Sequence, residues 1–374
     1  MNWARRTTLL LATVALAFAG EGVFPGAEWE RRSPVDLGFD ETALKRLIPA
    51  YGIGGVIVRH GYLAAIWGDP HIALQTASMG KAFTGTALGL AIDAGLVKLD
   101  SPVWMSWTGE GQLSYPYKYL NFGFQRNITW RHFVTMTAGF PDIELTPAGE
   151  MGDSRWTYAR RPPGVRFEYS DSGMWRFSQA LTSLWGKDLK QLLDEKIFTP
   201  IGVPPARWDW ISGKEVHDKE LYPEFPGYGG YLDPPYEING QVVRGGPGWV
   251  VINAADLARF GYLMLRSGRW NGKQLLSEQW TRDMRKPHAR MSDVLDYGLN
   301  WWVYRGGKAF AARGISLGWA AISSLWVVPD SDLVVSFIRS NLHSRTQAEA
   351  YRKNDWDERD FAFQVAEAIV HPER

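Results

Sequence analysis

Hydrophobic residues follow two different spacings in the N-terminal third of the chain. Between residues 54 and 67, two apolar runs with alternating polar positions are separated by an Arg-His-Gly turn, which predicts a β-hairpin. From Ser78 onward the apolar residues recur at helical spacing until about Gly95. Ser78 is therefore expected at the N-terminus of a long, mostly apolar helix that is buried in the protein.

The rest of the chain changes its pattern twice. Residues 99–245 contain short helical pieces among scattered Pro, Gly and Trp, which is typical of a loop-rich helical insertion. Asn253 is then a candidate N-cap for a helix that closes at Gly268. Further on, apolar segments predict consecutive strands at 297–307, 309–315, 320–329 and 332–340. A last helix is predicted at 356–371.

The order of these elements predicts the fold class. Strands near both ends and helices in the middle indicate an α/β fold, in which one domain is discontinuous. That domain comprises residues 20–98 and 246–374, and the mainly helical domain comprises residues 99–245. With 374 residues, the chain has enough material to bury a sizeable core.

Composition excludes several classes of function. The formal net charge is +1, without long blocks of like charge, so nucleic acid is not an expected partner. The absence of cysteine excludes disulfides, a thiol nucleophile and any cysteine metal site. Nineteen tryptophans favour a heavily aromatic core, with a pocket for apolar ligands as the alternative.

The first nineteen residues have the three parts of an export signal. Arg5 and Arg6 form the basic region, an apolar stretch follows, and Ala17-Phe18-Ala19 forms a cleavage site. The apolar run is short for a membrane span, although an N-terminal anchor or a buried helix remains an alternative. We therefore expect a periplasmic or secreted protein without a stable membrane span after cleavage of residues 1–19.

Two serine motifs are candidates for a nucleophile. Ser316 lies in Gly-Ile-Ser-Leu-Gly, the spelling of a nucleophile elbow, which needs a strand before the serine and a helix after it. Asp330 or Asp332 could pair with His343 to complete such a site. However, the residues after the motif predict another strand, and too little chain remains for a doubly wound sheet. This pattern argues against Ser316.

The second candidate is Ser78, followed three residues later by Lys81. One helical turn brings the two side chains to the same face, so that the amine can lie beside the hydroxyl. The helix N-terminus favours the negative charge that develops on attack, and burial of a lysine favours the neutral form that can accept a proton. The motif alone leaves open the alternative of a serine N-cap beside a solvated lysine.

Seven segments, including the one that begins at Ser78, resemble segments of a single superfamily and follow the same order along the chain. They lie at 58–69, 78–103, 128–140, 163–181, 252–276, 297–303 and 326–337. With them the chain is similar to the serine β-lactamase and penicillin-binding superfamily. The similarity is closest to its class C-like esterases and to the linear-amide hydrolases typified by 6-aminohexanoate-dimer hydrolase. It implies an antiparallel β-sheet flanked by helices, with an inserted mainly helical domain.

The resemblance also implies a mechanism, which is acyl transfer through an acyl-enzyme on Ser78. Lys81 and Tyr169 would be the coupled pair that handles the proton. The family's Tyr-x-Asn motif stands here as Tyr169-Ser170-Asp171. A charged Asp171 would stabilise a protonated Lys81, which makes the distribution of protons differ from the family's. The alternatives are a structural role for Tyr169 and an N-cap role for Asp171.

The family's third motif, Lys-Thr-Gly or His-x-Gly, aligns best with residues 312–314. Gly314 would let substrate approach the strand edge, and the backbone N–H of Ile315 would complete an oxyanion hole with that of Ser78. Ala312 lacks the usual cation, and Arg313 should face the other side of the strand. Trp319 follows the motif as a candidate wall for substrate.

These features predict a small-molecule substrate, either a carboxylic ester or a linear amide. A D,D-peptidase or β-lactamase would need a cation for the substrate carboxylate, and a non-catalytic binding protein on the same fold would lack turnover. No cofactor is expected, because the mechanism needs none and the seven histidines lack ligand spacing.

Overall fold

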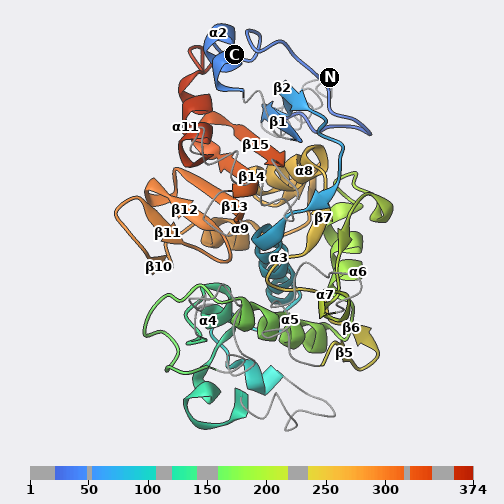
Figure 1. The fold of residues 1–374 in the computed structure, drawn as a ribbon, viewed down its shortest axis with the longest axis vertical. Coiled ribbons are helices and arrows are strands. Elements are labelled where there is room, and N and C mark those ends of the chain that lie inside the picture. The colour runs from blue at the N-terminus through green and yellow to red at the C-terminus, as the bar shows by residue number, and fades with distance from the viewer. Residues whose placement is uncertain are drawn as a thin grey trace, which may run out of the picture.

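A computed structural model describes residues 22–48, 53–106, 120–140, 159–217, 235–315, 321–338 and 358–373. In these residues the main sheet has the strand order β10-β11-β12-β13-β14-β15-β1-β2, and every neighbouring pair is antiparallel (Figure 1). Its strands are β1 Gly54–Arg59, β2 Tyr62–Gly68, β10 Ala289–Arg290, β11 Leu295–Tyr297, β12 Trp302–Tyr304, β13 Ala309–Ile315, β14 Ala321–Val328 and β15 Leu333–Ile338. The predicted antiparallel sheet flanked by helices is thereby confirmed.

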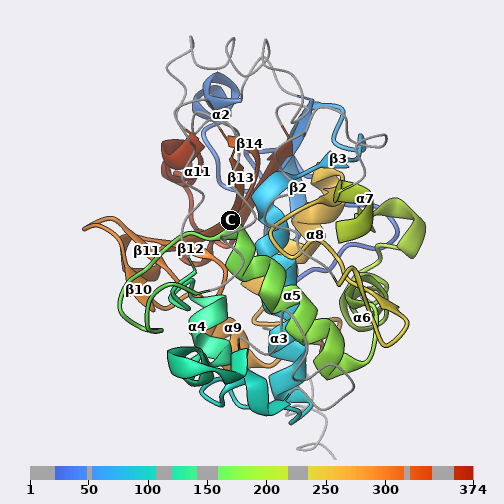
Figure 2. The same cartoon turned by 60° about the horizontal axis from the view of Figure 1, so that its bottom comes forward.

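The helices and the short strands lie around this sheet. The helices are α2 Glu41–Leu47, α3 Gly80–Asp93, α4 Trp130–Val134, α5 Asp171–Trp185, α6 Leu189–Leu193, α7 Gly213–His217, α8 Ala254–Leu265, α9 Glu278–Met284 and α11 Glu358–Glu367. The short strands are β3 Leu74–Gln75, β4 Asp209–Trp210, β5 Glu237–Ile238, β6 Gln241–Val242, β7 Val250–Ile252, β8 Arg269–Trp270 and β9 Lys273–Gln274. The helical region between residues 99 and 245 thus supplies α4 to α7; α4, α5 and α6 lie in the lower half of Figure 2, and α7 lies above α6.

Alternation along β14 explains how helices cover both faces of the sheet. Leu325 faces α8, where Gly261 leaves room for its side chain. The next residue, Trp326, faces the opposite side and packs edge-on against Phe363 of α11. Successive side chains of a strand point to opposite faces, so the apolar run predicted here is buried on both sides.

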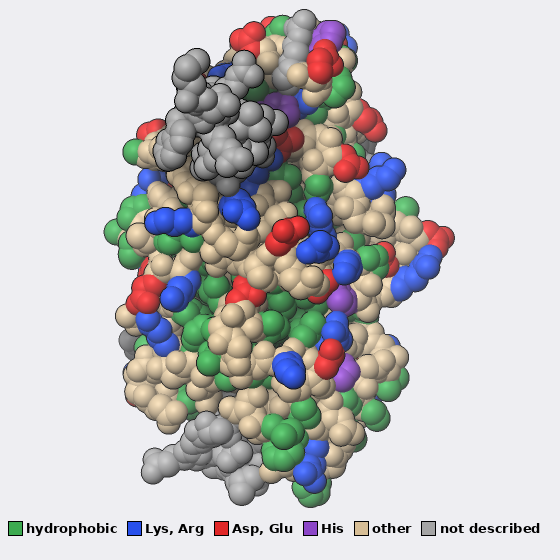
Figure 3. Space-filling view, turned by 180° about the vertical axis from the view of Figure 1, so that it is seen from behind, with side chains coloured by type: hydrophobic (Ala, Val, Ile, Leu, Met, Phe, Trp, Pro, Cys, Tyr) green, Lys and Arg blue, Asp and Glu red, His purple; other side chains and the backbone are tan. Residues whose placement is uncertain are grey.

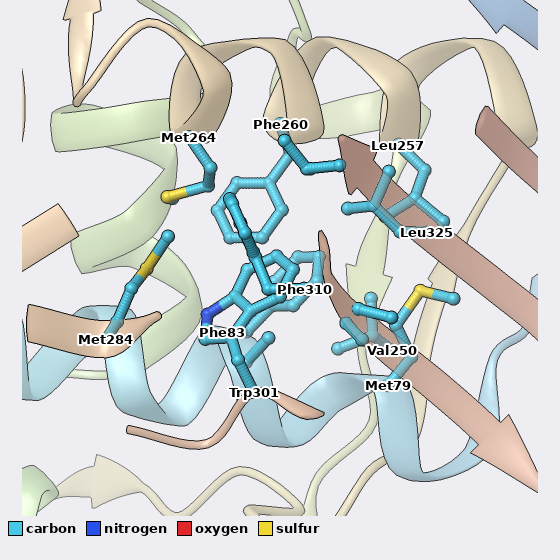
Figure 4. Close-up of a cluster of buried hydrophobic side chains, with 14 of the residues drawn as sticks. Met79, Phe83, Val250, Leu257, Phe260, Met264, Met284, Trp301, Phe310 and Leu325 are labelled. Atoms are coloured by element: carbon cyan, nitrogen blue, oxygen red, sulfur yellow. The ribbon is translucent and has the colours of Figure 1, made fainter. Parts of the chain in front are cut away.

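Helix α3 is the element that joins the sheet to the helical region. Its residues from Gly80 to Ala91 are all buried, because α5 and α6 cover the sides that the sheet leaves open. Phe83 of this helix packs against Phe260 of α8, in a cluster that also contains Trp301 and Phe310 (Figure 4). The apolar character of α3 on every side is therefore a consequence of its central position.

Several local predictions agree with the structure, and one is wrong. The hairpin is β1–β2, with the turn at His60 and Gly61, and the Asn253 side chain caps α8 by accepting from the Asp256 N–H at 2.8 Å. The single strand predicted at 297–307 is instead two strands, β11 and β12. They are separated by a turn in which Asn300 has a φ of 60°.

Some of the sequence predictions fall on residues that are not described. The export signal, residues 1–19, lies outside the described residues, and so does Ser316. The flanking strands β13 and β14 are described, and they pair antiparallel with Gly314 opposite Ser323. A strand rather than a helix therefore follows Ser316, as expected from its sequence context. In the described part of the chain, no helix is long and apolar enough to cross a membrane.

The surface carries charges of both signs. Lysine and arginine side chains are interspersed with acidic ones on the face seen in Figure 3. This distribution agrees with the net charge of +1 over the whole sequence.

Two partly buried histidines make the fold sensitive to acid. Burial lowers the pKa of His132 and of His288. The unfolded chain then takes up these protons at a higher pH than the folded protein does, so stability falls as the pH drops through about 6.5. His132 forms a capping box with Thr129, which glutamine at the same position can also form.

When the pH is lowered from about 7.5 to about 5, we therefore expect the melting temperature of His132→Gln to fall by less than that of the wild type. Scanning calorimetry at both pH values measures the difference in melting temperature. His71→Gln, at an exposed position, is the control and should behave like the wild type. Equal losses for His132→Gln and the wild type would show that this histidine does not cause the acid sensitivity.

Candidate active site

Ser78 lies in a 3₁₀ turn, Ala77–Met79, directly before α3. The sequence predicted Ser78 at the N-terminus of this helix, and the structure agrees, since the 3₁₀ turn runs directly into α3. Ala77 opens the turn with a φ of 51°, which is in the left-handed region. Its N–H donates to Gln75 Oε1 at 2.8 Å, which holds the conformation. Ser78 is consequently presented at the end of a buried helix with its own side chain partly exposed.

Strand β13 holds this turn from the other side. Gly314 lies against Thr76, and a Cβ built on Gly314 would come within 2.0 Å of the Thr76 carbonyl oxygen. The same carbonyl accepts from Ser323 Oγ at 2.7 Å, and the Thr76 N–H and Oγ1 both donate to the Val250 carbonyl. Only glycine fits such an approach, so Gly314 helps to position the chain before Ser78.

Lys81 is the buried centre of the site. Its Nζ donates to Ser78 Oγ at 2.9 Å and to the Pro247 carbonyl oxygen at 2.7 Å. The same nitrogen forms an ion pair with Asp171 Oδ1 at 2.7 Å. The side chains of Lys81 and Asp171 are only 3% and 13% exposed, so little water screens this pair.

The second motif approaches Lys81 from the start of α5. Ser170, not Asp171, is the N-cap of this helix, since its Oγ accepts from the Gly173 N–H at 3.0 Å. Asp171 is the first residue of the helix, and its carboxylate is thereby available to Lys81. The ring of Tyr169 lies with its centroid 4.6 Å from Lys81 Nζ. The structure thus brings Ser78, Lys81, Tyr169 and Asp171 together.

The third motif is described only in part. Ile315 ends β13, and the pairing with β14 shifts register between Gly314 and Ile315, which is a β-bulge. Bulges of this kind re-aim the backbone beside active sites. The side chain of Ile315 and the whole of Trp319 lie outside the described residues.

The two residues before Gly314 face opposite sides of the strand, as expected. Ala312 is buried and lies on the same face of β13 as Gly314, which is the face toward Thr76. Arg313 is on the other face, where it donates to the Tyr304 hydroxyl at 3.1 Å and lies 5.9 Å from the centroid of the Trp302 ring. Arg313 therefore does not share the face of Ala312, and it lies beside Trp302, the ring that stacks on Tyr169.

Two contacts of the site were missed by the sequence analysis. The Pro247 carbonyl belongs to a Gly-Gly-Pro-Gly stretch at 245–248, and a Cβ on Gly80 would come within 2.8 Å of Gly248. The glycines were a usable signal for close backbone approach. Trp302, which stacks on Tyr169, gave no such signal among nineteen tryptophans. The described residues contain no group of His, Asp and Glu side chains that could hold a metal ion.

Comparison with known proteins identifies the family. A family model described as Beta-lactamase matches residues 68–360, which is most of the chain. The chain belongs to the Beta-lactamase family. A curated relative, the Unguisins hydrolase ungD' of Aspergillus campestris, is 24% identical over 217 residues. That match covers 53% of this chain and only 39% of the relative.

Solved structures of Beta-lactamase family proteins share the fold. A Bacillus anthracis protein named after 6-aminohexanoate-dimer hydrolase has a TM-score of 0.60 at 15% identity, over 92% of this chain and 89% of that one. A penicillin-binding protein from Bacillus halodurans has a TM-score of 0.56 at 16% identity, over 83% and 97% of the two chains. A penicillin-binding protein homologue from Pyrococcus abyssi, which is octameric, has a TM-score of 0.57 at 16% identity, over 89% and 76%. At these identities the likeness shows the fold alone, which is that of the family's hydrolases.

The Tyr-x-Asn motif that residues 169–171 resemble has asparagine where this chain has Asp171, so Asp171→Asn is an informative change. Without the carboxylate, the buried Lys81 amine loses the 2.7 Å ion pair that balances its charge. We expect the pH dependence of kcat/KM to change, while its highest value falls by no more than about tenfold. Asp100→Asn, which breaks an ion pair with Arg131 at the surface, is the control. An unchanged pH profile of kcat/KM in Asp171→Asn would contradict a role of the Asp171 carboxylate in proton transfer at the site.

Proposed function

We propose that this protein is a serine hydrolase that forms an acyl-enzyme on Ser78. The observation that carries the proposal is the 2.9 Å hydrogen bond between Lys81 Nζ and Ser78 Oγ. A partly exposed hydroxyl beside a buried amine is the arrangement expected of a nucleophile and the group that takes its proton. The family membership supports hydrolysis as the reaction class.

Acylation begins when Ser78 Oγ forms a bond with the substrate carbonyl carbon. The hydroxyl proton passes to the pair formed by Lys81 and Tyr169, and the same pair returns a proton to the leaving alkoxide or amine as its bond to carbon breaks. Water then attacks the ester carbon of the acyl-enzyme and releases the acid, while Ser78 recovers its proton. Asp171 balances the charge of the Lys81 ammonium during these steps.

The backbone N–H groups of Ser78 and Ile315 are the proposed oxyanion hole. The first precedes α3, where the helix dipole favours negative charge, and the second follows the close contact of Gly314 with Thr76. That contact connects the two segments that carry the donors. Removal of one such donor typically costs 10² to 10³ in kcat, about 3 kcal/mol.

We further propose that the substrates are neutral esters or linear amides. Ala312 offers no cation to a substrate carboxylate, and the charge of Lys81 is balanced by Asp171. A buried substrate carboxylate without a partner is strongly disfavoured. Similarity to proteins named after 6-aminohexanoate-dimer hydrolase and Unguisins hydrolase supports amides as one substrate class.

A penicillin-recognising D,D-peptidase or β-lactamase is the second candidate. The likeness of the fold to penicillin-binding proteins favours it, whereas the missing cation at Ala312 opposes it. A non-catalytic binding protein on the same fold is disfavoured by the contact of Ser78 with Lys81. The N-terminal pattern supports export, and we propose a periplasmic or secreted location.

Labelling with a fluorophosphonate tests the nucleophile. Peptide mapping should find the phosphonyl group on Ser78. Lys81→Ala should slow the labelling by about a hundredfold or more without unfolding the protein, since proton transfer is lost. Lys45→Ala, which removes an exposed pair with Glu41, is the control and should label at the wild-type rate. A label on Ser316 would overturn the assignment.

The substrate class is tested with the wild-type enzyme on two chromogenic substrates. We expect kcat/KM for a short p-nitrophenyl ester to exceed that for a cephalosporin by at least about tenfold, because the carboxylate of the cephalosporin lacks a partner. Ala312→Lys should raise the rate of acylation by penicillin and lower the activity on the ester. If the cephalosporin is the better substrate of the wild type, the penicillin-recognising alternative replaces this proposal.

A further inference from the structure

Tyr169 is placed by packing rather than by regular secondary structure. The residues from Val165 to Tyr169 belong to no helix or strand, and Ser170 only begins α5 as its N-cap. One backbone hydrogen bond, from the Glu168 N–H to the Met136 carbonyl at 2.9 Å, ties this segment to the region of α4. The rings that Tyr169 touches therefore contribute to the position of its phenol beside Lys81.

The ring of Tyr169 stacks on Trp302 of β12. Their centroids are 5.7 Å apart and the ring planes differ by 19°. Trp302 in turn meets Tyr297 of β11 edge-on, at 5.1 Å and 88°. Phe167, two residues before Tyr169, packs on the same Tyr297 at 5.1 Å. The irregular segment is thus held against the sheet by two aromatic contacts, one on each side of Glu168.

Trp302 itself has little freedom to move. It is 7% exposed and stands opposite Ala311 of β13, whose small side chain leaves the ring its space. Tyr297 is fully buried, and burial raises its pKa far above the ordinary value, so its hydroxyl stays neutral. A rigid ring on a sheet is a more precise support for a reacting group than a loop backbone.

We propose that Trp302 is a positioning residue that holds the Tyr169 phenol beside Lys81 during acyl transfer. It acts through Tyr169 and, being buried, does not bind the substrate. The inference rests on the proposed function, in which Tyr169 handles the proton. A displacement of about 1 Å in such a group can cost about 10²-fold in rate, which sets the size of the expected effect.

The chain offers a matched control in Trp326 of β14. Ala311 pairs with Trp302 on one side and with Trp326 on the other, so both tryptophans project from the same face of the sheet. Trp326 is fully buried, and its ring packs on that of Tyr304 at 4.6 Å with the planes tilted by 43°. Replacing it disturbs the sheet in a similar way but leaves the support of Tyr169 in place.

The test compares Trp302→Met, Trp302→Phe and Trp326→Met in the full chain. We expect Trp302→Met to lower kcat on a p-nitrophenyl ester by about 10²-fold with little change in KM, and to alter the alkaline limb of the pH profile. Trp302→Phe, which keeps an aromatic face, should recover to within about threefold of the wild type. Trp326→Met and Trp302→Met should lower the melting temperature by similar amounts. In Trp326→Met, however, kcat should stay within about twofold of the wild-type value.

A double-variant cycle with Tyr169→Phe shows through which residue Trp302 acts. If the tryptophan works through the phenol, a Trp302 replacement should cost almost nothing further in the Tyr169→Phe background. Should Trp302→Met fail to fold, Trp302→Phe serves in the same cycle. Additive losses, or an equal loss of kcat in Trp326→Met, would overturn the inference. An unimpaired Tyr169→Phe single variant would instead refute the proposed role of Tyr169.

Discussion

The burial of Lys81 is the constraint on which the site depends. A buried ammonium is costly unless charged and polar partners surround it, and each partner here comes from a different part of the chain. Asp171 comes from the start of α5, Pro247 from the glycine-rich stretch before β7, and Ser78 from the turn before α3. Satisfying one amine therefore fixes the helical region, the glycine-rich stretch before β7 and the nucleophile relative to one another.

Glycines make this convergence sterically possible. Gly80 and Gly248 allow two backbones to approach so closely that a carbonyl reaches the amine, and Gly314 allows β13 to lie on Thr76. These positions differ from glycines in surface turns, because a side chain there would meet backbone atoms that cannot move aside. The catalytic geometry is thus encoded by missing side chains as much as by reactive ones.

Features that depend on residues close together in the sequence could be predicted, whereas features that depend on distant residues could not. The β1–β2 hairpin, the Asn253 cap and the proximity of Ser78 to Lys81 are set by residues a few positions apart, and local patterns revealed them. The unusual φ of Ala77, which opens the 3₁₀ turn at Ser78, is an exception, since it is local and was not predicted. The role of the Pro247 carbonyl could not be predicted, because every residue has a backbone oxygen. The role of Trp302 could not be predicted either, because tryptophans are abundant in this chain.

The pairing of β1 with β15 has a consequence for how the protein acquires its structure. Gly54 stands opposite Ile338, so the first strand of the main sheet waits for a partner from near the other end of the chain. Contacts of such long separation slow folding, because the intervening loop must close before they form. A ribosome-bound chain cannot complete this sheet, so the edge of β1 that pairs with β15 stays open to chaperones or to aggregation until synthesis has passed β15.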